Sequence, residues 1–260
     1  MLKINEAIIE LNNYPDGTLL VKDGICIDNE NITITWKYES DSELFALICL
    51  TKHLKNKNNT VSLQMFYCPN GRMDRVKNPE DIFTLKYFAE IINSLKFERV
   101  YILDPHSSVS EALINNIAIQ TPKEYIKQAI ENCNPDILFF PDEGAMKRYS
   151  SMAEKEYAFG IKKRDWTTGK IEGLDVAGCV DKIKDSRILI VDDICSRGGT
   201  FYHSAKKLKE LGAKEIYLYI THCENTILEG ELLTSGLIEK VYTTNSIFTK
   251  EHEKIEVFEL

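Results

Sequence analysis

The chain lacks the features that place a protein in a membrane or in an oxidising compartment. No apolar run approaches the roughly 20 residues that a membrane-spanning helix needs. Lys3, Glu6 and Glu10 interrupt the apolar residues at the N-terminus, which excludes a secretory signal peptide. The seven cysteines are scattered, odd in number and never spaced as C-x-x-C, so we expect neither a disulfide framework nor a zinc site. These absences predict a cytoplasmic protein with reduced thiols and no membrane partner.

The chain also lacks an excess of positive charge and the two common nucleotide-binding loops. Its formal net charge of −8 argues against a nucleic-acid partner. Neither G-x-x-x-x-G-K-[ST] nor G-x-G-x-x-G occurs, which excludes a Walker loop and the dinucleotide fingerprint. The 260 residues, 43% of them hydrophobic, can form one large domain or two modest ones.

Short apolar segments alternate along the chain with amphipathic ones. The segments that we expect to form strands are Thr18–Val21, Ile32–Trp36, Val61–Tyr67, Val100–Leu103, Ile137–Phe140, Ala158–Lys162, Ile188–Val191, Glu215–Ile220 and Lys240–Thr243. The expected helices are Glu43–Leu54, Pro79–Ile92, Lys123–Asn132, Ala145–Glu154 and Phe201–Leu211, and Lys163–Gly173 is expected as a charged hairpin. This alternation predicts an α/β fold with two domains, 1–121 and 122–260, each a mostly parallel sheet flanked by helices.

The segment Arg187–Thr200, RILIVDDICSRGGT, is the most informative part of the chain. A buried strand is followed by two acids, a glycine-rich loop and the start of a helix. Backbone N–H groups and the helix dipole converge on an anion in such a loop, and the acids suit sugar hydroxyls or Mg²⁺. We therefore predict a ribose-phosphate site. Its expected residues are Asp192, Asp193, Cys195, Ser196, Arg197, Gly198, Gly199 and Thr200.

The run VDDICSRGGT resembles the ribose-5-phosphate loop of the phosphoribosyltransferase superfamily. Further motifs occur in the order typical of ribose-phosphate diphosphokinases (PRPP synthetases), which carry two tandem phosphoribosyltransferase-like domains. These motifs are YPDGT at 14–18, MFYCPNGRMDR at 65–75, DPHS at 104–107, PDEGAMKR at 141–148, IKKR at 161–164 and TH at 221–222. The chain is similar to this family from Tyr14 to its end.

The resemblance implies a Mg²⁺-dependent transfer of diphosphate from ATP to the anomeric hydroxyl of a ribose 5-phosphate moiety, with release of AMP. It places ATP on the first domain and the ribose phosphate on the second, and it implies a homodimer or a larger homo-oligomer. The residues that it assigns to ATP are Tyr14, Asp16, Arg72, Asp74 and Arg75. His106 and Asp142 would hold the metal, and His106, Lys162 and Arg164 would be catalytic, with Lys163 as the alternative to Lys162.

The chain departs from the family pattern at Thr18, at Met73 and above all at Ser196–Arg197, where the family usually has Asp-Thr. The last change removes an acid and adds a cation beside the expected anion. Two acceptors therefore stay open, ribose 5-phosphate and ADP-ribose. The second would suit a compact, divergent member, because such relatives, including phage-borne ones, are associated with NAD salvage. Two other functions also stay open: a phosphoribosyltransferase that uses PRPP, and a catalytically silent regulatory relative.

Overall fold

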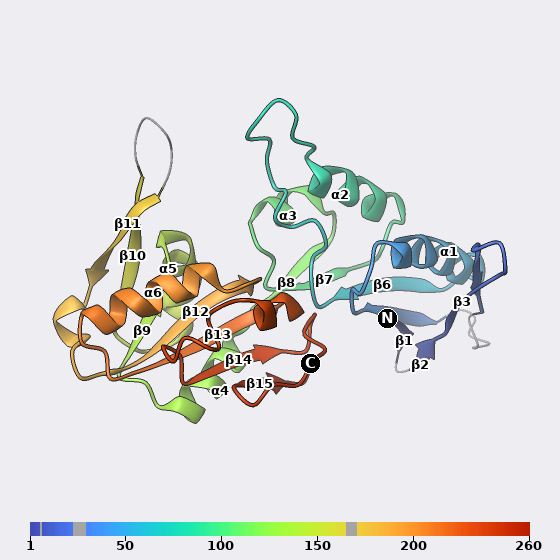
Figure 1. Ribbon diagram of the computed structural model, residues 1–260. Helices are drawn as coiled ribbons and strands as arrows, with labels where there is room; N and C mark the ends of the chain where they lie inside the picture. Colours follow the sequence, from blue (N-terminus) through green and yellow to red (C-terminus); the bar gives the residue numbers. More distant parts are fainter. Residues whose placement is uncertain (6, 23–29, 165–170) are drawn as a thin grey trace. The chain divides into compact units, whose positions relative to one another are not determined.

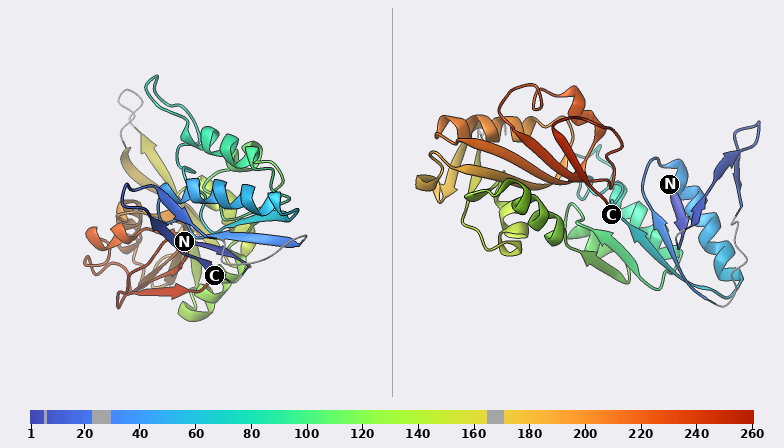
Figure 2. Two further views of the ribbon diagram at one scale, coloured as in Figure 1. Left: turned by 90° about the vertical axis from the view of Figure 1, so that its right-hand side faces the viewer. Right: turned by 90° about the horizontal axis from the view of Figure 1, so that it is seen from below.

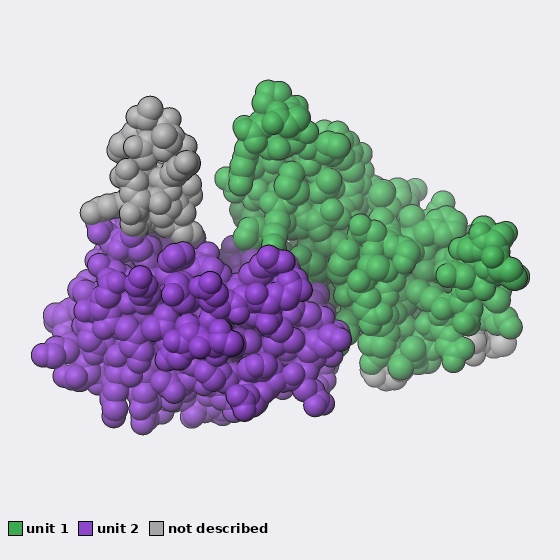
Figure 3. Space-filling model, in the orientation of Figure 1, with its two compact units in different colours: residues 1–121 green, residues 122–260 purple. Residues whose placement is uncertain are grey.

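The computed structural model describes residues 1–5, 7–22, 30–164 and 171–260. The chain divides into two compact units, Met1–Thr121 (unit 1) and Pro122–Leu260 (unit 2), which Figure 3 colours separately. Within these described ranges, no helix combines the length and the apolar character needed to cross a bilayer.

Unit 1 contains a six-stranded sheet in the order β2-β1-β5-β6-β7-β8 (Figure 1). Its strands are β1 (Leu2–Ile4), β2 (Ala7–Ile9), β5 (Asn31–Trp36), β6 (Thr60–Met65), β7 (Val100–Leu103) and β8 (Ile117–Gln120). Strand β1 runs antiparallel to both of its neighbours, whereas β5 to β8 are parallel. Strands β3 (Leu11–Asn13) and β4 (Leu19–Val21) form a separate antiparallel pair. The loops after β6 and β7, which carry the predicted site residues, therefore leave the same edge of the sheet.

Two helices of unit 1 pack against one set of strand side chains. Helices α1 (Ser42–Asn56) and α2 (Thr84–Ser94) share a core with Ile34 of β5 and Leu63 of β6. The next residue of β5, Thr35, is only half-buried. The short α3 (Val109–Leu113) follows β7. The helix expected from Pro79 begins only at Thr84, and Ile82 is 62% exposed, so the apolar pattern overestimated the length of this helix.

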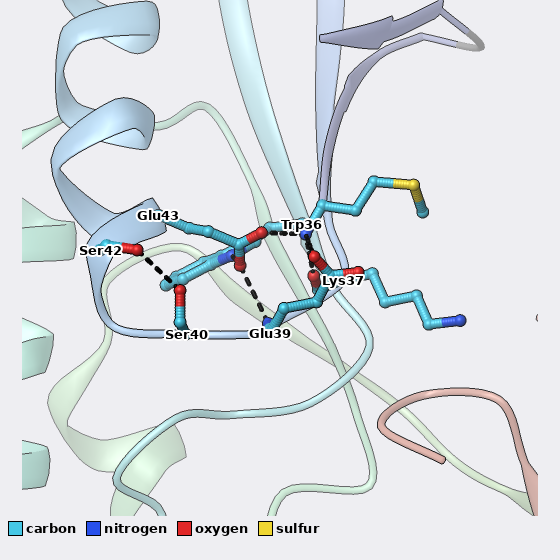
Figure 4. A network of polar contacts seen from close by, with 7 residues as sticks. Trp36, Lys37, Glu39, Ser40, Ser42 and Glu43 are labelled. Carbon is cyan, nitrogen blue, oxygen red and sulfur yellow. Dashed lines mark hydrogen bonds and ion pairs between the residues drawn. The ribbon is translucent and has the colours of Figure 1, made fainter. Parts of the chain in front are cut away.

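Buried Glu43 connects the start of α1 to β5 and to the N-terminus (Figure 4). Its Oε2 accepts hydrogen bonds from Trp36 Nε1 at 2.8 Å and from the Glu39 backbone N–H at 2.9 Å. Its Oε1 accepts from the N-terminal ammonium of Met1. Burial alone would raise the pKa of Glu43, but these hydrogen bonds together outweigh it and hold the pKa below its ordinary value.

Unit 2 contains a seven-stranded sheet in the order β11-β10-β9-β12-β13-β14-β15. Its strands are β9 (Ile137–Phe140), β10 (Tyr157–Arg164), β11 (Ile171–Gly178), β12 (Arg187–Cys195), β13 (Glu215–Cys223), β14 (Lys240–Thr244) and β15 (Ile255–Phe258). All neighbouring pairs are parallel except β10 with β11. From β9 the chain proceeds to β10 on one side and later to β12 on the other. The strand order thus reverses between β9 and β12, where sheets of this kind bind ligands.

Helices cover both faces of the unit 2 sheet (Figure 2). The helices and 3₁₀ turns of this unit are α4 (Lys123–Cys133), α5 (Glu143–Tyr149), η1 (Ser150–Met152), η2 (Val180–Lys182), α6 (Gly199–Glu210) and η3 (Asn225–Glu229). Ile188 and Ile190 of β12 share a core with α6, while Leu189 and Val191 share another with α4 and α5. Successive side chains of a strand point to opposite faces, so an uninterrupted apolar run belongs to a strand that is covered twice.

The structure confirms the predicted α/β class with two mostly parallel sheets. Strands β1, β2, β3, β8 and β15 were not predicted, because each is short or only partly apolar. The helix expected over Ala145–Glu154 ends at Tyr149 and continues as η1. The hairpin expected at Lys163–Gly173 is formed by β10 and β11, whose register pairs these two residues, and residues 165–170 between them lie outside the described ranges.

Candidate active site

A segment with two adjacent glycines (Ser196–Thr200, the glycine loop) leads from the end of β12 into the first residues of α6 in unit 2. Gly198 has a φ of +80°, and a Cβ atom there would lie 2.9 Å from Leu232 Cδ2, so both conformation and packing require glycine. A Cβ at Gly199 would meet nothing within 4 Å. Gly199 and Thr200 are exposed where α6 begins. The first N–H groups of this 12-residue helix have no acceptor within the helix itself, as an anion site requires.

The two acids at the end of β12 lie in different environments. Asp193 is buried, and its Oδ2 lies 2.9 Å from Arg148 Nη1 of α5. Asp192 is half-buried, and its Oδ1 accepts a hydrogen bond from the Asp193 N–H at 2.9 Å. Burial, followed by the neighbouring charges of Asp193 and Asp142, raises the pKa of Asp192 well above its ordinary value. A cation or sugar hydroxyls beside Asp192 would relieve this unfavourable arrangement.

Asp142 follows β9, the parallel neighbour of β12. It is the N-cap of α5, and its Oδ1 accepts a hydrogen bond from the Ala145 N–H at 3.1 Å. Asp142 and Asp192 thus leave the same edge of the sheet, on either side of the point where the strand order reverses.

In unit 1, the structure brings together the predicted loops after β6 and β7. Asp74 is buried, and Arg75 contacts both of its carboxylate oxygens, Nε at 2.7 Å and Nη2 at 2.9 Å. These bonds, with lesser contributions from Ser107 and His106, lower the pKa of Asp74. A Cβ atom at Gly71 would lie 3.6 Å from His106 Cβ, so the loops are in contact. Asp74 therefore orients Arg75 and joins the two loops.

The predicted residues Tyr14 and Asp16 lie in the turn between β3 and β4. Tyr14 is 51% exposed. Asp16 Oδ1 accepts hydrogen bonds from the Thr18 N–H at 2.9 Å and from the Thr18 hydroxyl at 2.7 Å, which lower the pKa of Asp16. Thr18, at a position where the chain departs from the family pattern, therefore stabilises the turn.

The predicted cations Lys162 and Arg164 belong to β10, where their backbones pair with Leu174 and Ile171 of β11. A register shift separates Lys163 from Arg164. The side chains of all three cations lie outside the described part of the chain, so their catalytic role stays a prediction. Cys195, which was predicted as a ribose-phosphate residue, is the last residue of β12 and is only 1% exposed.

Three further residues at these loops were not predicted as site residues: Arg148, Thr226 and Glu229. Arg148 pairs with Asp193, as described above. The Thr226 hydroxyl lies 3.1 Å from that of Ser196, and Glu229 Oε2 lies 2.8 Å from Arg197 Nη2. A sequence signal existed for the last two, because the loops after neighbouring parallel strands meet, and these residues follow β13.

The TH motif ends in a buried polar network. His222 is 2% exposed and pairs in register with Ile194 of β12. Its Nδ1 lies 2.9 Å from Ser246 Oγ, which also donates to the Thr221 carbonyl at 3.3 Å. This network joins the end of β13 to the segment after β14.

The chain is similar in sequence and in fold to known proteins of one kind. No protein-family model matches the chain. The chain is 28% identical to the ribose-phosphate pyrophosphokinase of Thermococcus kodakarensis over 93% of this chain and 86% of the relative. It is also 28% identical to that of Aquifex aeolicus, over 98% and 84%. Its fold is similar to that of phosphoribosylpyrophosphate synthetase from Mycobacterium smegmatis, with a TM-score of 0.79, 16% identity, and coverage of 97% and 86%.

Proposed function

The chain is an enzyme of the ribose-phosphate pyrophosphokinase type, and we propose that it transfers the diphosphoryl group of ATP to the anomeric hydroxyl of a ribose 5-phosphate moiety. The anomeric oxygen attacks the β-phosphorus, the bond between the α,β-bridging oxygen and the β-phosphorus breaks, and AMP leaves. The alignment of the two substrates and the stabilisation of charge on the phosphoryl oxygens supply most of the catalysis in such transfers.

One observation carries the assignment of the acceptor site: an acid with a raised pKa, Asp192, lies at the same strand end as the glycine loop. Asp192 precedes the loop, and burial raises its pKa. The N–H groups at the start of α6 suit the 5-phosphate, and Asp192 suits the ribose hydroxyls. Asp193 contributes indirectly, because its carboxylate is paired with Arg148.

The donor atoms present fit a magnesium ion. Asp142 and Asp192 offer carboxylate oxygens whose charges repel one another, and Mg²⁺ prefers oxygen ligands from one or two carboxylates together with substrate phosphates. We propose that Asp142 would supply an oxygen ligand to the ion, and the metal-binding role of His106 stays a prediction. When bound, the ion neutralises charge on the ATP phosphates. Within the described residues, no three His, Cys, Asp or Glu side chains gather as a metal-binding group.

We assign ATP to the loops of unit 1 and to the β3–β4 turn. Arg75, held through Nε and Nη2 by Asp74, is preorganised for a planar contact with phosphate or adenine. Arg72 lies exposed in the same loop, and Tyr14 and Asp16 would contact adenine in a homodimer or larger homo-oligomer. Lys162 and Arg164 would stabilise the transferring group, and their loss should lower kcat.

Two acceptors fit this site, ribose 5-phosphate and ADP-ribose. The relatives named above support the first. Arg197, an exposed residue of the glycine loop, favours the second, because ADP-ribose has another phosphate beyond the one that the loop would bind. With ADP-ribose the product would carry a diphosphate at the anomeric carbon, and the enzyme would serve NAD salvage.

The test measures AMP release by chromatography. The protein is incubated with ATP and Mg²⁺ and with each acceptor in turn. The variant Asp192→Asn should lower kcat/KM about 100-fold, because the neutral amide weakens hydrogen bonds from the ribose. The control Asp181→Asn removes an exposed acid from η2 and should change nothing. Without AMP release by the wild-type protein, the silent relative becomes the better interpretation. Consumption of PRPP with a base, without use of ATP, would indicate a phosphoribosyltransferase.

A further inference from the structure

A segment after β13 (Glu224–Gly230, the rim segment) contacts the glycine loop along its length. The Glu224 N–H donates to the Cys195 carbonyl at 2.8 Å, and the Thr226 hydroxyl lies 3.1 Å from that of Ser196. A Cβ atom at Gly230 would lie only 1.9 Å from the Arg197 carbonyl oxygen, so the two backbones are in close contact there. The rim segment is thus a wall of the proposed acceptor site.

One contact between the rim segment and the glycine loop differs in character from the others. Arg197 Nη2 lies 2.8 Å from Glu229 Oε2, and the side chains are 71% and 58% exposed. An ion pair so exposed contributes between about 0 and 1 kcal/mol to stability. The Arg197 guanidinium can therefore leave Glu229 for another anion at little cost.

The position of this exposed pair would let it distinguish between the two proposed acceptors. A phosphate monoester ends at the loop that binds it. A diphosphate-linked ribose continues outward from the loop, past the exposed side chains at its rim. Its outer phosphate carries the charge and the oxygen pair that a guanidinium binds through two hydrogen bonds.

We propose that Glu229 and Arg197 determine acceptor specificity, with Glu229 holding Arg197 until the outer phosphate of a diphosphate-linked ribose replaces the carboxylate. This inference rests on the proposed function and adds a preference between its two acceptors. Glu229 has two opposing effects on this ligand. It positions Arg197 at the rim, and it competes with the outer phosphate for the guanidinium. Ribose 5-phosphate has no outer phosphate and does not depend on the exchange.

The experiment measures the binding of ADP-ribose and of ribose 5-phosphate by titration calorimetry without ATP, followed by KM and kcat with ATP and Mg²⁺. Glu229→Gln removes the competing charge and should tighten ADP-ribose about three- to fivefold, the equivalent of up to about 1 kcal/mol. Arg197→Thr should weaken ADP-ribose about tenfold. In both variants the affinity for ribose 5-phosphate should shift less than the affinity for ADP-ribose, because only ADP-ribose has the outer phosphate.

The matched control is Glu231→Gln, which removes an exposed carboxylate two positions further along the chain. It should leave both affinities unchanged. Equal shifts for the two acceptors would overturn the inference, because Arg197 would then serve the inner phosphate. Unchanged affinities in both variants would also overturn it while leaving the proposed function intact. If the wild-type protein binds neither acceptor, the proposed function fails and this inference fails with it.

Discussion

At the scale of single residues, two adjacent acids differ because of what faces each of them. Asp193 is paired with Arg148, whereas Asp192 accepts a backbone N–H and keeps a raised pKa. Active sites commonly keep such a group, because the interaction that would satisfy it comes from the substrate or its metal. The two adjacent acids in the sequence do not reveal this difference, since the guanidinium that pairs with Asp193 comes from α5, which is distant in the chain.

The ion pair between Arg148 and Asp193 leads to a prediction about stability. Arg148→Met should lower the free energy of unfolding by about 3 kcal/mol, because it removes the cation that lies 2.9 Å from the buried carboxylate of Asp193. Lys147→Met removes a neighbouring cation whose side chain is 72% exposed and should cost less than about 0.5 kcal/mol. Urea unfolding of the two variants provides the comparison. Equal losses would show that Arg148 does not stabilise Asp193.

At the scale of elements, the glycine loop depends on a neighbour that is distant in sequence. Gly198→Ala adds a methyl group against Leu232 in a left-handed conformation, whereas Gly236→Ala, with a φ of +70°, meets nothing within 4 Å. Both variants should lose about 1 kcal/mol of stability through the backbone. Only Gly198→Ala should lose about 1–3 kcal/mol more and bind ribose 5-phosphate more weakly. The measurements are urea unfolding and calorimetry. Similar results for the two variants would argue against a packed loop.

The attachment of β5 and α1 to the N-terminus through Glu43 gives a prediction about pH. The pKa of Glu43 is below its ordinary value in the folded chain, so its contribution to stability is present above the unfolded pKa of about 4.3. This contribution is lost as the pH falls through the folded pKa. Glu43→Gln should cost about 2 kcal/mol at pH 7.

The test compares the wild type with Glu43→Gln, both without an N-terminal tag, by urea unfolding between pH 7 and pH 3. The difference in unfolding free energy should shrink as the pH falls, because protonation makes the wild-type side chain neutral as well. A difference that stays constant with pH would show that the charge of Glu43 does not contribute.

At the scale of the whole molecule, each unit has a hydrophobic core of its own. The core cluster of unit 1 draws its residues from Leu2 to Ile114, and the two clusters of unit 2 draw theirs from Ile126 to Phe258. Residues 122–260 expressed alone should therefore unfold cooperatively. Because the glycine loop and the rim segment both belong to unit 2, this piece should bind ribose 5-phosphate with an affinity within about fivefold of that of the full chain.

The same piece should release no AMP, since the loops assigned to ATP belong to unit 1. Thermal unfolding, calorimetry and the AMP assay test these expectations. Failure of residues 122–260 to fold would show that the units depend on one another. Light scattering on the full chain tests the proposed homo-oligomer, and a monomer would remove the support for adenine contacts by Tyr14 and Asp16.

The sequence by itself determined the α/β class, most element positions and the place of the glycine loop. The reason is physical: apolar runs and helical spacing are local properties, and a strand, acids, glycines and a helix start must follow one another directly in such a loop. The short strands β1, β2 and β8, which lie at or next to the edges of the unit 1 sheet, could not be predicted, because a sheet neighbour stabilises them more than their own residues do.

Only the tertiary structure decided which charged groups compensate each other. The pairs Arg148–Asp193 and Arg197–Glu229 join residues 45 and 32 positions apart, according to their numbers in the chain. Such pairs depend on which strands are neighbours and on where the loops after them meet, and the β9–β12 and β12–β13 pairings establish both. The two ion pairs differ in burial, and therefore in what they can do. Asp193 is held inside unit 2, while Glu229 stays at the surface, where its partner can be exchanged for a ligand.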